Sequence, residues 1–333
     1  MLARIAQELF WLGRDLTRAE QTARMLDGAF HADVASAPRD RSIALSWDGV
    51  MAIIGAKPPV PGERKGAHTT AAAADGPLTI AARRGEVSRL LTLDLDSPAS
   101  IVSCVERARE RVRTLRDVIS TEMWQALNSF YLTLGRYDLH SALQTGPYSV
   151  YHEVKERCAL FWGLVERTML RDEGRAFLEA GGRIEEADMV LRLLRVSVPP
   201  EPHPNEIDGD DEAFALLQAV GGFQAYWRAI RNAPTVGAVV RFLLYDAAYP
   251  CSVACSVDAV RSALASADPQ PRSSPPVLRL GRLIADLELQ RRTPGELGDL
   301  PRQLAAVQDE LALVDQDIDE RYFAIAALAA LHL

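Results

Sequence analysis

The sequence predicts an all-α fold, a multi-helix bundle built from two internally duplicated halves. Apolar residues recur at helical spacing along most of the chain, and alternating runs rich in Val, Ile and Thr, which are typical of strands, are nearly absent. Two stretches of the first half recur in the same order in the second half. The 48% hydrophobic and 25% charged fractions are those of a globular chain that can bury a core.

The individual helices are expected from apolar spacing and from start signals. The first, at residues 2–30, carries on one face Leu9, Leu12, Leu16, Ala19, Ala23, Leu26 and Phe30. Pro98 at a first helical position opens a helix to residue 119, and Ser120 starts another. Further helices are expected at residues 147–169, 172–197, 212–231, 235–246, 250–266, 275–291 and 301–331.

Two segments of different composition interrupt this helical pattern. Residues 55–78 are rich in Pro, Gly and Ala, which predicts a mobile insert. Residues 199–211 are acidic and rich in proline, which predicts a linker or surface loop. We expect a single domain over residues 1–333, because the two halves share one seam instead of acting independently.

The internal matches define these halves. Residues 13–26, with the pattern GxxLxxAExxxRxL, recur as residues 181–194, with the pattern GxxIxxADxxxRxL, at an offset of 168 residues. Residues 89–109 recur as residues 241–261, at an offset of 152 residues. An extra loop in the first half accounts for the difference of 16 residues, and segment 55–78 can supply it. We therefore predict internal repeats at residues 1–167 and 168–333.

The charge balance constrains the partners. The chain has 45 acidic and 37 basic residues, a net charge of −8, and its pI lies near 5.4. Nucleic acids and anionic membranes present negative phosphates, so we expect neither as a partner. Lysine occurs only at Lys57, Lys65 and Lys155, so nearly every cation is an arginine, a planar fork suited to carboxylate pairing.

Cysteine usage and the termini favour a cytoplasmic protein. Four cysteines are too few for a disulfide framework in a chain of this length. The N-terminal stretch carries Glu8, Arg14 and Asp15, so it lacks the apolar run of a signal peptide. The apolar stretch 323–333 is far shorter than the roughly 20 residues of a membrane span and is a candidate surface for forming a homo-oligomer. The six histidines are scattered without a spaced ligand pair, so no metal site is expected.

A polar column borders the apolar face of the repeated helix. Its first copy consists of Thr17, Glu20 and Arg24. Its second copy consists of Glu185, Asp188 and Arg192. Half-buried charges need partners, because an unpaired buried charge is costly. Two interpretations follow: a salt-bridge network that ties two helices together, or a polar pocket between the halves that holds an amino-acid-like or peptide group.

These same helices resemble the bacterial Alpha-E family, an α-helical domain named for a Glu-Arg pair. The resemblance covers essentially the whole chain, and it is carried in order by residues 9–27, 107–128, 168–194, 242–253 and 317–323. The family's Glu-Arg pair falls on Thr17-Arg18 in the first copy and on Glu185-Glu186 in the second. This chain therefore keeps Arg18 and Glu185, half of the pair in each copy.

The resemblance implies a role in ATP-dependent formation of amide or peptide bonds, because Alpha-E proteins are typically encoded beside, or fused to, an ATP-grasp protein. The sequence has none of the Gly-rich motifs that bind nucleotide phosphates, so no cofactor is expected. We expect an accessory or binding subunit that acts with an ATP-grasp ligase on a peptide or amino-acid substrate. The alternative is an enzyme that forms or cleaves amide bonds at a Glu/Asp-Arg site between the repeats.

The candidate site residues follow from these hypotheses. For the enzyme, the candidate acid–base residues are Glu185, Asp188 and Glu20. The candidate substrate-binding residues are the arginines Arg18, Arg24, Arg192, Arg109 and Arg261. The last two are included because they occupy equivalent positions of the 152-residue match. A third hypothesis is an oligomeric scaffold assembled through residues 323–333.

Overall fold

The regular elements of the described chain are all helical, which confirms the predicted all-α class. The structure is a computed structural model that describes residues 1–35, 45–56, 80–136, 138, 141–142, 148–198, 210–293 and 297–324. The first part of the chain forms α1 (Ala3–Ala35), α2 (Trp47–Ile54), α3 (Ile80–Leu93), α4 (Ile101–Thr114), α5 (Thr121–Leu134) and α7 (Tyr148–Thr168). The second part forms α8 (Glu173–Ser197), α9 (Asp210–Ala219), α10 (Phe223–Ile230), α11 (Val236–Tyr245), α12 (Val253–Ala267), α13 (Pro275–Arg292), α14 (Leu300–Ile318) and the π-helical turn η4 (Asp319–Phe323).

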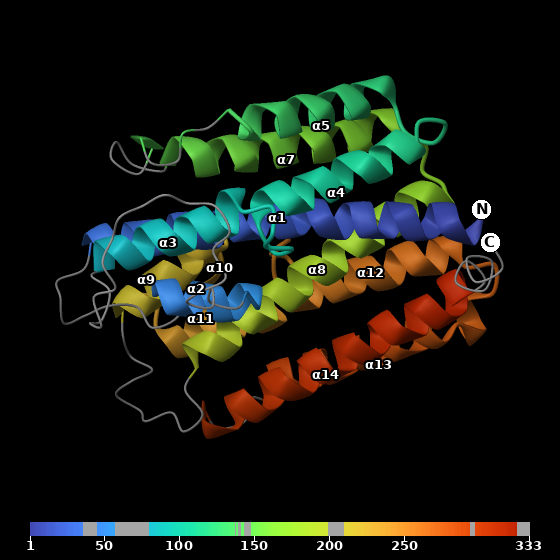
Figure 1. Cartoon of the computed structure of the whole chain (residues 1–333). Coiled ribbons are helices and arrows are strands. Elements are labelled where there is room, and N and C mark those ends of the chain that lie inside the picture. Colours follow the sequence, from blue (N-terminus) through green and yellow to red (C-terminus); the bar gives the residue numbers. More distant parts are fainter. Residues whose placement is uncertain are drawn as a thin grey trace.

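Two long central helices, α1 and α8, organise the other elements (Figure 1). In the first set, α4 packs on α1, α5 packs on α4, and α7 packs on both α5 and α1. In the second set, α12 packs on α8, α13 packs on α12, and α14 packs on both α13 and α8. The two sets therefore share one order of pairings and meet where α1 contacts α8. The origin of the two sets by duplication stays a prediction.

The contact between α1 and α8 is a close and parallel one. The terminal ammonium of Met1 lies 2.7 Å from Glu173 at the start of α8, and further along Arg18 contacts Glu185. A Cβ on Gly181 would lie 1.9 Å from the carbonyl oxygen of Phe10, so only glycine fits there. The glycines of the repeated pattern thus allow the two backbones to touch, and we call this contact the seam.

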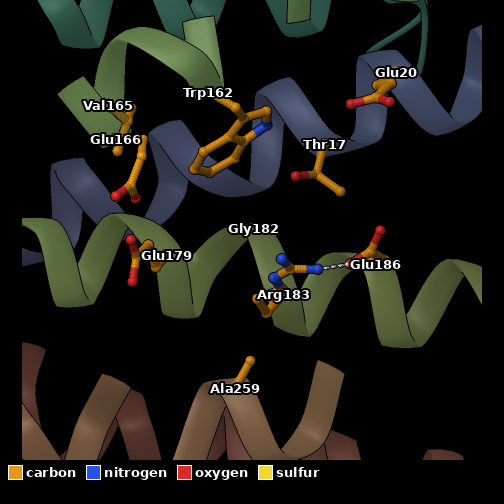
Figure 2. Close-up of a pocket in the computed structure, with 10 residues that line it drawn as sticks. All are labelled: Thr17, Glu20, Trp162, Val165, Glu166, Glu179, Gly182, Arg183, Glu186 and Ala259. Atoms are coloured by element: carbon orange, nitrogen blue, oxygen red, sulfur yellow. Dashed lines mark hydrogen bonds and ion pairs between the residues drawn. The ribbon is translucent and has the colours of Figure 1, made fainter. Parts of the chain in front are cut away.

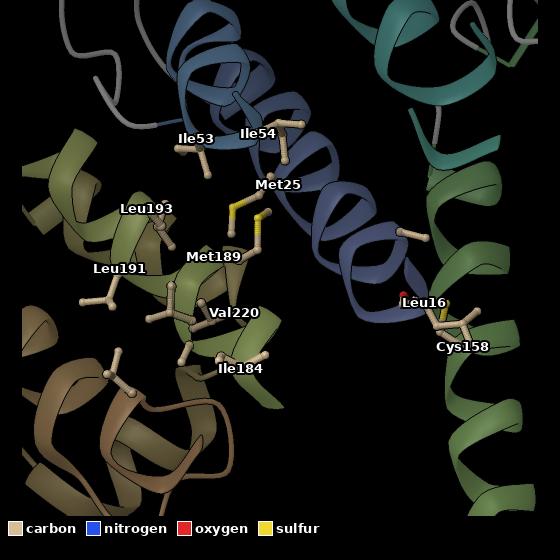
Figure 3. Close-up of a cluster of buried hydrophobic side chains, with 14 of the residues drawn as sticks. Leu16, Met25, Ile53, Ile54, Cys158, Ile184, Met189, Leu191, Leu193 and Val220 are labelled. Carbon is tan, nitrogen blue, oxygen red and sulfur yellow. Dashed lines mark hydrogen bonds between the residues drawn. The ribbon is translucent and has the colours of Figure 1, made fainter. Parts of the chain in front are cut away.

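The core continues from the seam into both sets of helices. Met25 of α1 and Met189 of α8 are buried and lie near Ile53 of α2 (Figure 3). On the other side of α1, Leu16 lies beside Cys158 of α7, whose thiol donates to the Leu16 carbonyl at 3.7 Å. Burying these apolar side chains removes them from water and supplies most of the stabilisation of such a bundle.

Some helix boundaries differ from those expected. The helix expected at 212–231 is two helices, because Gly221 adopts a left-handed φ of 66° between α9 and α10. The helix expected to reach residue 119 ends at Thr114, and the helix expected at 301–331 leaves α-geometry after Ile318. The helices α2 and α3, on either side of the predicted insert, were not expected.

Parts of three predicted segments lie outside the described residues. For the insert at 55–78, only residues 55–56 are described. For the acidic loop at 199–211, residues 210–211 are described and begin α9. For the tail at 323–333, the description ends at residue 324.

The end of the described chain is anchored to the second set. Arg321 and Tyr322 both donate to Asp268 at the C-terminal end of α12. Burial opposes ionisation of Asp268, but these donors outweigh it and hold its pKa well below the usual range. Phe323 packs against Phe10 of α1, so η4 also closes one end of the seam. Among the described residues, no helix combines the length and apolar character that a membrane crossing requires.

Candidate functional site

One side of the seam is closed by a network of ion pairs. Glu185 of α8 accepts a hydrogen bond from Arg14 Nε at 2.9 Å and another from Arg18 Nε at 2.5 Å. Arg14 Nη1 also donates to both carboxylate oxygens of Asp315 on α14, at 2.7 and 2.8 Å. We call Arg14, Arg18, Glu185 and Asp315 the seam network. It joins three helices through carboxylate–guanidinium pairs.

The charges of the seam network are mutually compensated. The Glu185 side chain is 0% exposed. Burial favours its neutral form, but Arg18 and Arg14 outweigh burial and lower the pKa of Glu185. For Arg14, burial likewise disfavours the charge, and Glu185 and Asp315 raise its pKa above the ordinary value. Glu185 is therefore an ionised carboxylate with both oxygens occupied, and it is poorly placed to exchange protons with a substrate.

Asp188 and Arg192 lie beside the seam network. Asp188 pairs with Arg192 at 2.8 Å and accepts a hydrogen bond from Gln308 Nε2 of α14 at 3.0 Å. Together with Arg14 and Asp315 they line a small cavity of about 200 Å³. The other lining residues are Ile184, Leu311 and Ala312. This cavity is the space that remains between α8 and α14 around the seam network.

The opposite side of the seam carries a larger cavity of about 410 Å³, which we call the seam pocket. Helices α1, α7, α8 and α12 supply its walls (Figure 2). Its lining consists of Thr17, Glu20, Trp162, Val165, Glu166, Glu179, Gly182, Arg183, Glu186 and Ala259. Small residues make the space, because Gly182 has no side chain and Ala259 has only a methyl group. The ring of Trp162 lies directly over Gly182, where a Cβ would come within 2.8 Å of it.

Carboxylates dominate the polar lining of the seam pocket. Glu186 accepts from Arg183 at 2.7 Å and from the Ser256 hydroxyl at 3.3 Å. Glu20 accepts two hydrogen bonds from Arg24, at 2.7 and 3.0 Å, one turn along α1. The lining itself has four carboxylates and one guanidinium, and arginines outside the lining pair with the other three carboxylates: Arg24 with Glu20, and Arg175 with Glu166 and Glu179.

The structure divides the sequence-predicted residues between three places. Arg18 and Glu185, which the resemblance assigns as the retained halves of the Glu-Arg pair, meet in the seam network. Asp188 and Arg192 line the small cavity, whereas Glu20 lines the seam pocket with Arg24 as its partner. Both interpretations of the polar column therefore have a structural counterpart, a tie on one side of the seam and a pocket on the other.

Arg109 and Arg261 are not part of the seam. Arg109 donates to Asn128 of α5 at 2.8 Å, and its guanidinium lies 4.9 Å from the ring centroid of Tyr131. Arg261 lies 3.4 Å from Asp258 on its own helix, α12. Their equivalent positions in the 152-residue match reflect their places on α4 and α12, which pack in the same way on α1 and α8.

Several residues at the seam were missed by the reasoning from sequence. Arg14 and Asp315 complete the seam network, yet they are 301 residues apart in sequence. Trp162 and Gly182 shape the seam pocket, and neither type of residue signals a pocket by itself. The recurrence of Gly13 as Gly181 was a usable signal, because a glycine inside a helix marks a close approach.

Ser252 has a structural role. Its hydroxyl is fully buried, accepts from the backbone N–H of Cys255 at 3.0 Å, and so begins α12 as its N-cap. Ser100 begins α4 in the same way. In the part of the chain that the structure describes, no three His, Cys, Asp or Glu side chains are grouped as metal ligands.

The fold and the seam define an all-α protein with two central parallel helices, tied together by a buried carboxylate between two arginines. The chain belongs to the Alpha-E family, described as a predicted alpha-helical domain with a conserved ER motif, which matches residues 1–323. Uncharacterized proteins of Mycobacterium bovis and Mycobacterium tuberculosis are 25% identical to it over 304 residues, which are 89% of this chain. The chain spans about a third of the length of these relatives. No solved structure matches it.

Proposed function

We propose that this protein is an accessory subunit that binds a peptide or amino-acid-like group and positions it for an ATP-grasp ligase. The observation that carries this proposal is the seam pocket, a cavity of about 410 Å³ beside a rigid ionic tie. Pockets that combine a few fixed polar groups with apolar and aromatic walls are the usual sites of small-ligand binding. The seam network holds the two helices of the pocket in place, as a binding site requires.

The chemistry of the seam supports binding over catalysis. Glu185 is ionised, buried and bonded through both oxygens. Glu20 and Glu186, the two inner carboxylates of the pocket, are each paired with an arginine of this chain. A general acid or base needs a side chain that can reach the reacting group and change its protonation state. These carboxylates are better suited to holding a charged ligand.

The partner and the cellular setting are part of the proposal. The ATP-grasp ligase as partner and the modification of a peptide as the reaction are both inferred from the family resemblance. About two thirds of the length of the mycobacterial relatives lies outside the matched region, since the match covers 33% of it. That organisation suits a domain that works beside another one. We also propose a cytoplasmic location, which is supported by four cysteines that are all free. We further propose that the two helix sets arose by duplication.

The partnership is tested by co-expressing this chain with an ATP-grasp protein, which the family resemblance leads us to expect beside its gene. We expect the two proteins to co-purify and the ligase to turn over faster in the complex. A ligase that neither co-purifies with the chain nor changes its turnover would refute the partnership.

An enzyme that forms or cleaves amide bonds stays the second candidate. It is favoured by the small cavity, where Asp188 and Arg192 face each other and where Arg192 Nε has no hydrogen-bond partner among the described residues. If the chain is that enzyme, an Asp188→Asn variant loses amide-bond activity and keeps its melting temperature. An active Asp188→Asn variant would exclude this site as the catalytic one.

A further inference from the structure

The seam pocket has a buried floor and an exposed mouth. Thr17, which is 6% exposed, and Glu186, whose side chain is 12% exposed, belong to the floor. Glu166 and Glu179 belong to the mouth, with side chains 56% and 40% exposed. Thr17 and Glu20 of α1 and Glu186 of α8 line the same pocket, with the Thr17 oxygen turned toward Trp162 and Gly182 (Figure 2). A ligand that reaches the floor therefore meets side chains of both central helices.

The hydroxyl of Thr17 has no hydrogen-bond partner among the described residues. Helical threonines commonly donate to the carbonyl one turn back. Thr133 and Thr168 do so in this chain, at 2.9 and 2.7 Å. The Thr17 oxygen instead lies toward Gly182, 3.1 Å from the position that a Cβ would take there. It faces the pocket with its donor and its acceptor lone pairs unused.

The two inner carboxylates also keep acceptor capacity. Both hydrogen bonds from Arg24 go to Glu20 Oε1, and Glu20 Oε2 receives none from a described residue. The hydrogen bonds from Arg183 and Ser256 both go to Glu186 Oε2. The thiol of Cys251 also hydrogen-bonds Glu186; burial raises the pKa of this thiol to about 12, so it stays a weak S–H donor. Stronger donors from a ligand can bind both carboxylates.

This set of groups selects the chemistry of the ligand. A primary ammonium carries three donors and no acceptor, which matches the Thr17 hydroxyl and one oxygen each of Glu20 and Glu186. A guanidinium prefers a carboxylate that it can engage with two parallel bonds. In this pocket, Arg24 already binds Glu20 and Arg183 already binds Glu186. The ring of Trp162 suits the apolar carbon atoms beside a cation.

We propose that the floor of the seam pocket binds the primary ammonium group of its ligand, as in the amino terminus of a peptide or a free amino acid. The inference rests on the proposed function, because it names the group by which the accessory subunit holds its ligand. The remainder of the ligand extends past Trp162 to the mouth, and the carboxyl side of the ligand stays accessible from there.

The probe is the dipeptide amide Ala-Ala-NH₂, compared with N-acetyl-Ala-Ala-NH₂, which lacks only the ammonium group. Titration calorimetry on the full chain at pH 7 should show binding of the free amine and at least an approximately ten-fold weaker affinity for the acetylated form, since one charge-assisted contact is worth that ratio or more. Thr17→Val and Glu20→Gln should each weaken binding of the free amine about three-fold to thirty-fold. The matched control is Glu153→Gln on α7, which lies outside the pocket lining and pairs with Arg157 one turn along its helix as Glu20 does with Arg24; it should change the affinity less than about two-fold.

Three results would overturn the inference: equal affinity for the two peptides, binding of neither at millimolar concentration, or unchanged affinity in both Thr17→Val and Glu20→Gln. Thermal melting of each variant verifies its folding, and Thr17→Val is nearly isosteric, so a folded variant is expected. The partnership is measured separately. Selective binding of the free amine without co-purification of a ligase refutes the partner alone, whereas co-purification without selective binding refutes the ammonium site alone.

Discussion

The two sides of the seam differ in what stands at corresponding positions of α1 and α8. On the closed side, Glu185 of α8 meets Arg14 and Arg18 of α1. In the register of the predicted repeat, with an offset of 168 residues, Glu185 corresponds to Thr17, Arg14 to Gly182 and Arg18 to Glu186. On the open side, Thr17 lies next to Gly182 and lines one pocket with Glu186. A carboxylate and two arginines on one side are thus replaced by a hydroxyl, a glycine and a carboxylate on the other.

This difference explains the cavity. The open side lacks the two long arginines of the closed side, which leaves volume that neither Trp162 nor Val165 of α7 fills. The carboxylates Glu20 and Glu186 on the open side are each paired with an arginine of their own helix, whereas on the closed side Arg14 and Arg18 of α1 bind Glu185 across the seam. The same helix contact is therefore an ionic tie on one side and leaves a pocket on the other, depending on three side chains.

The largest loss of stability is expected from adding a methyl group where the backbones of α1 and α8 touch. In Gly181→Ala, the Cβ would lie 1.9 Å from a backbone oxygen of Phe10, so the helices must separate. We expect the free energy of unfolding to fall by about 3 kcal/mol or more. In the neighbouring Gly182→Ala, the Cβ would meet side chains and no backbone, the Trp162 ring at 2.8 Å and the Thr17 hydroxyl at 3.1 Å, so the cost should be smaller, about 1 kcal/mol. Urea denaturation of both variants measures the difference, and equal losses would contradict the close approach.

A second pair of neighbouring residues compares the tie with the pocket. Glu185→Gln removes the charge that compensates two partly buried arginines, and we expect a loss of about 3 kcal/mol. Glu186→Gln removes the charge from a buried carboxylate whose one arginine partner, Arg183, is 40% exposed and can reach water, so its cost should be smaller, about 1 to 2 kcal/mol. Thermal melting of the two variants tests this order. A Glu185→Gln variant as stable as the wild type would mean that the seam network is not a structural tie.

The pH dependence of stability gives a third test. Glu185 has a lowered pKa in the folded chain, so its contribution is present above its unfolded value of 4.5 and is lost as pH falls through the folded pKa. The stability difference between wild type and Glu185→Gln should therefore be constant from pH 7 to about pH 5.5 and shrink below pH 4.5. Melting curves of both proteins between pH 3 and 7 measure it. A difference that grows on acidification would mean that burial, not the arginines, dominates at Glu185.

The fold was largely predictable because helix formation leaves a local record. Apolar spacing and serine or proline start signals mark α1, α4, α5, α8 and α12 within a few residues. The break at Gly221 was missed, since a glycine pair inside an apolar pattern does not reveal that one of its residues takes a left-handed φ. The end of α14 was missed because helical spacing continues through Phe323 while the backbone turns to π-geometry.

The site was predictable only where it lies on the repeated helix. Periodicity placed Glu20, Arg24 and Glu185 at the border of a buried face, and all three lie at the seam. Periodicity could not say which side of the seam closes, because that depends on Asp315 from a distant helix and on Trp162 from another. Long-range partners of this kind leave no pattern in a single sequence.

The smallest expected change in stability comes from converting the open side into a copy of the closed one. Thr17→Glu alone adds a third carboxylate beside Glu20 and Glu186, and we expect a loss of about 1 to 3 kcal/mol. Adding Glu186→Arg gives the new carboxylate an arginine partner across the seam, so the double variant should return to within about 1 kcal/mol of the wild type. Because this pair fills the floor, the double variant should also lose binding of Ala-Ala-NH₂. A double-mutant cycle measures the coupling energy between Thr17→Glu and Glu186→Arg. If the losses in stability are additive, the open side cannot be rebuilt as a tie. More than three side chains would then distinguish the two sides.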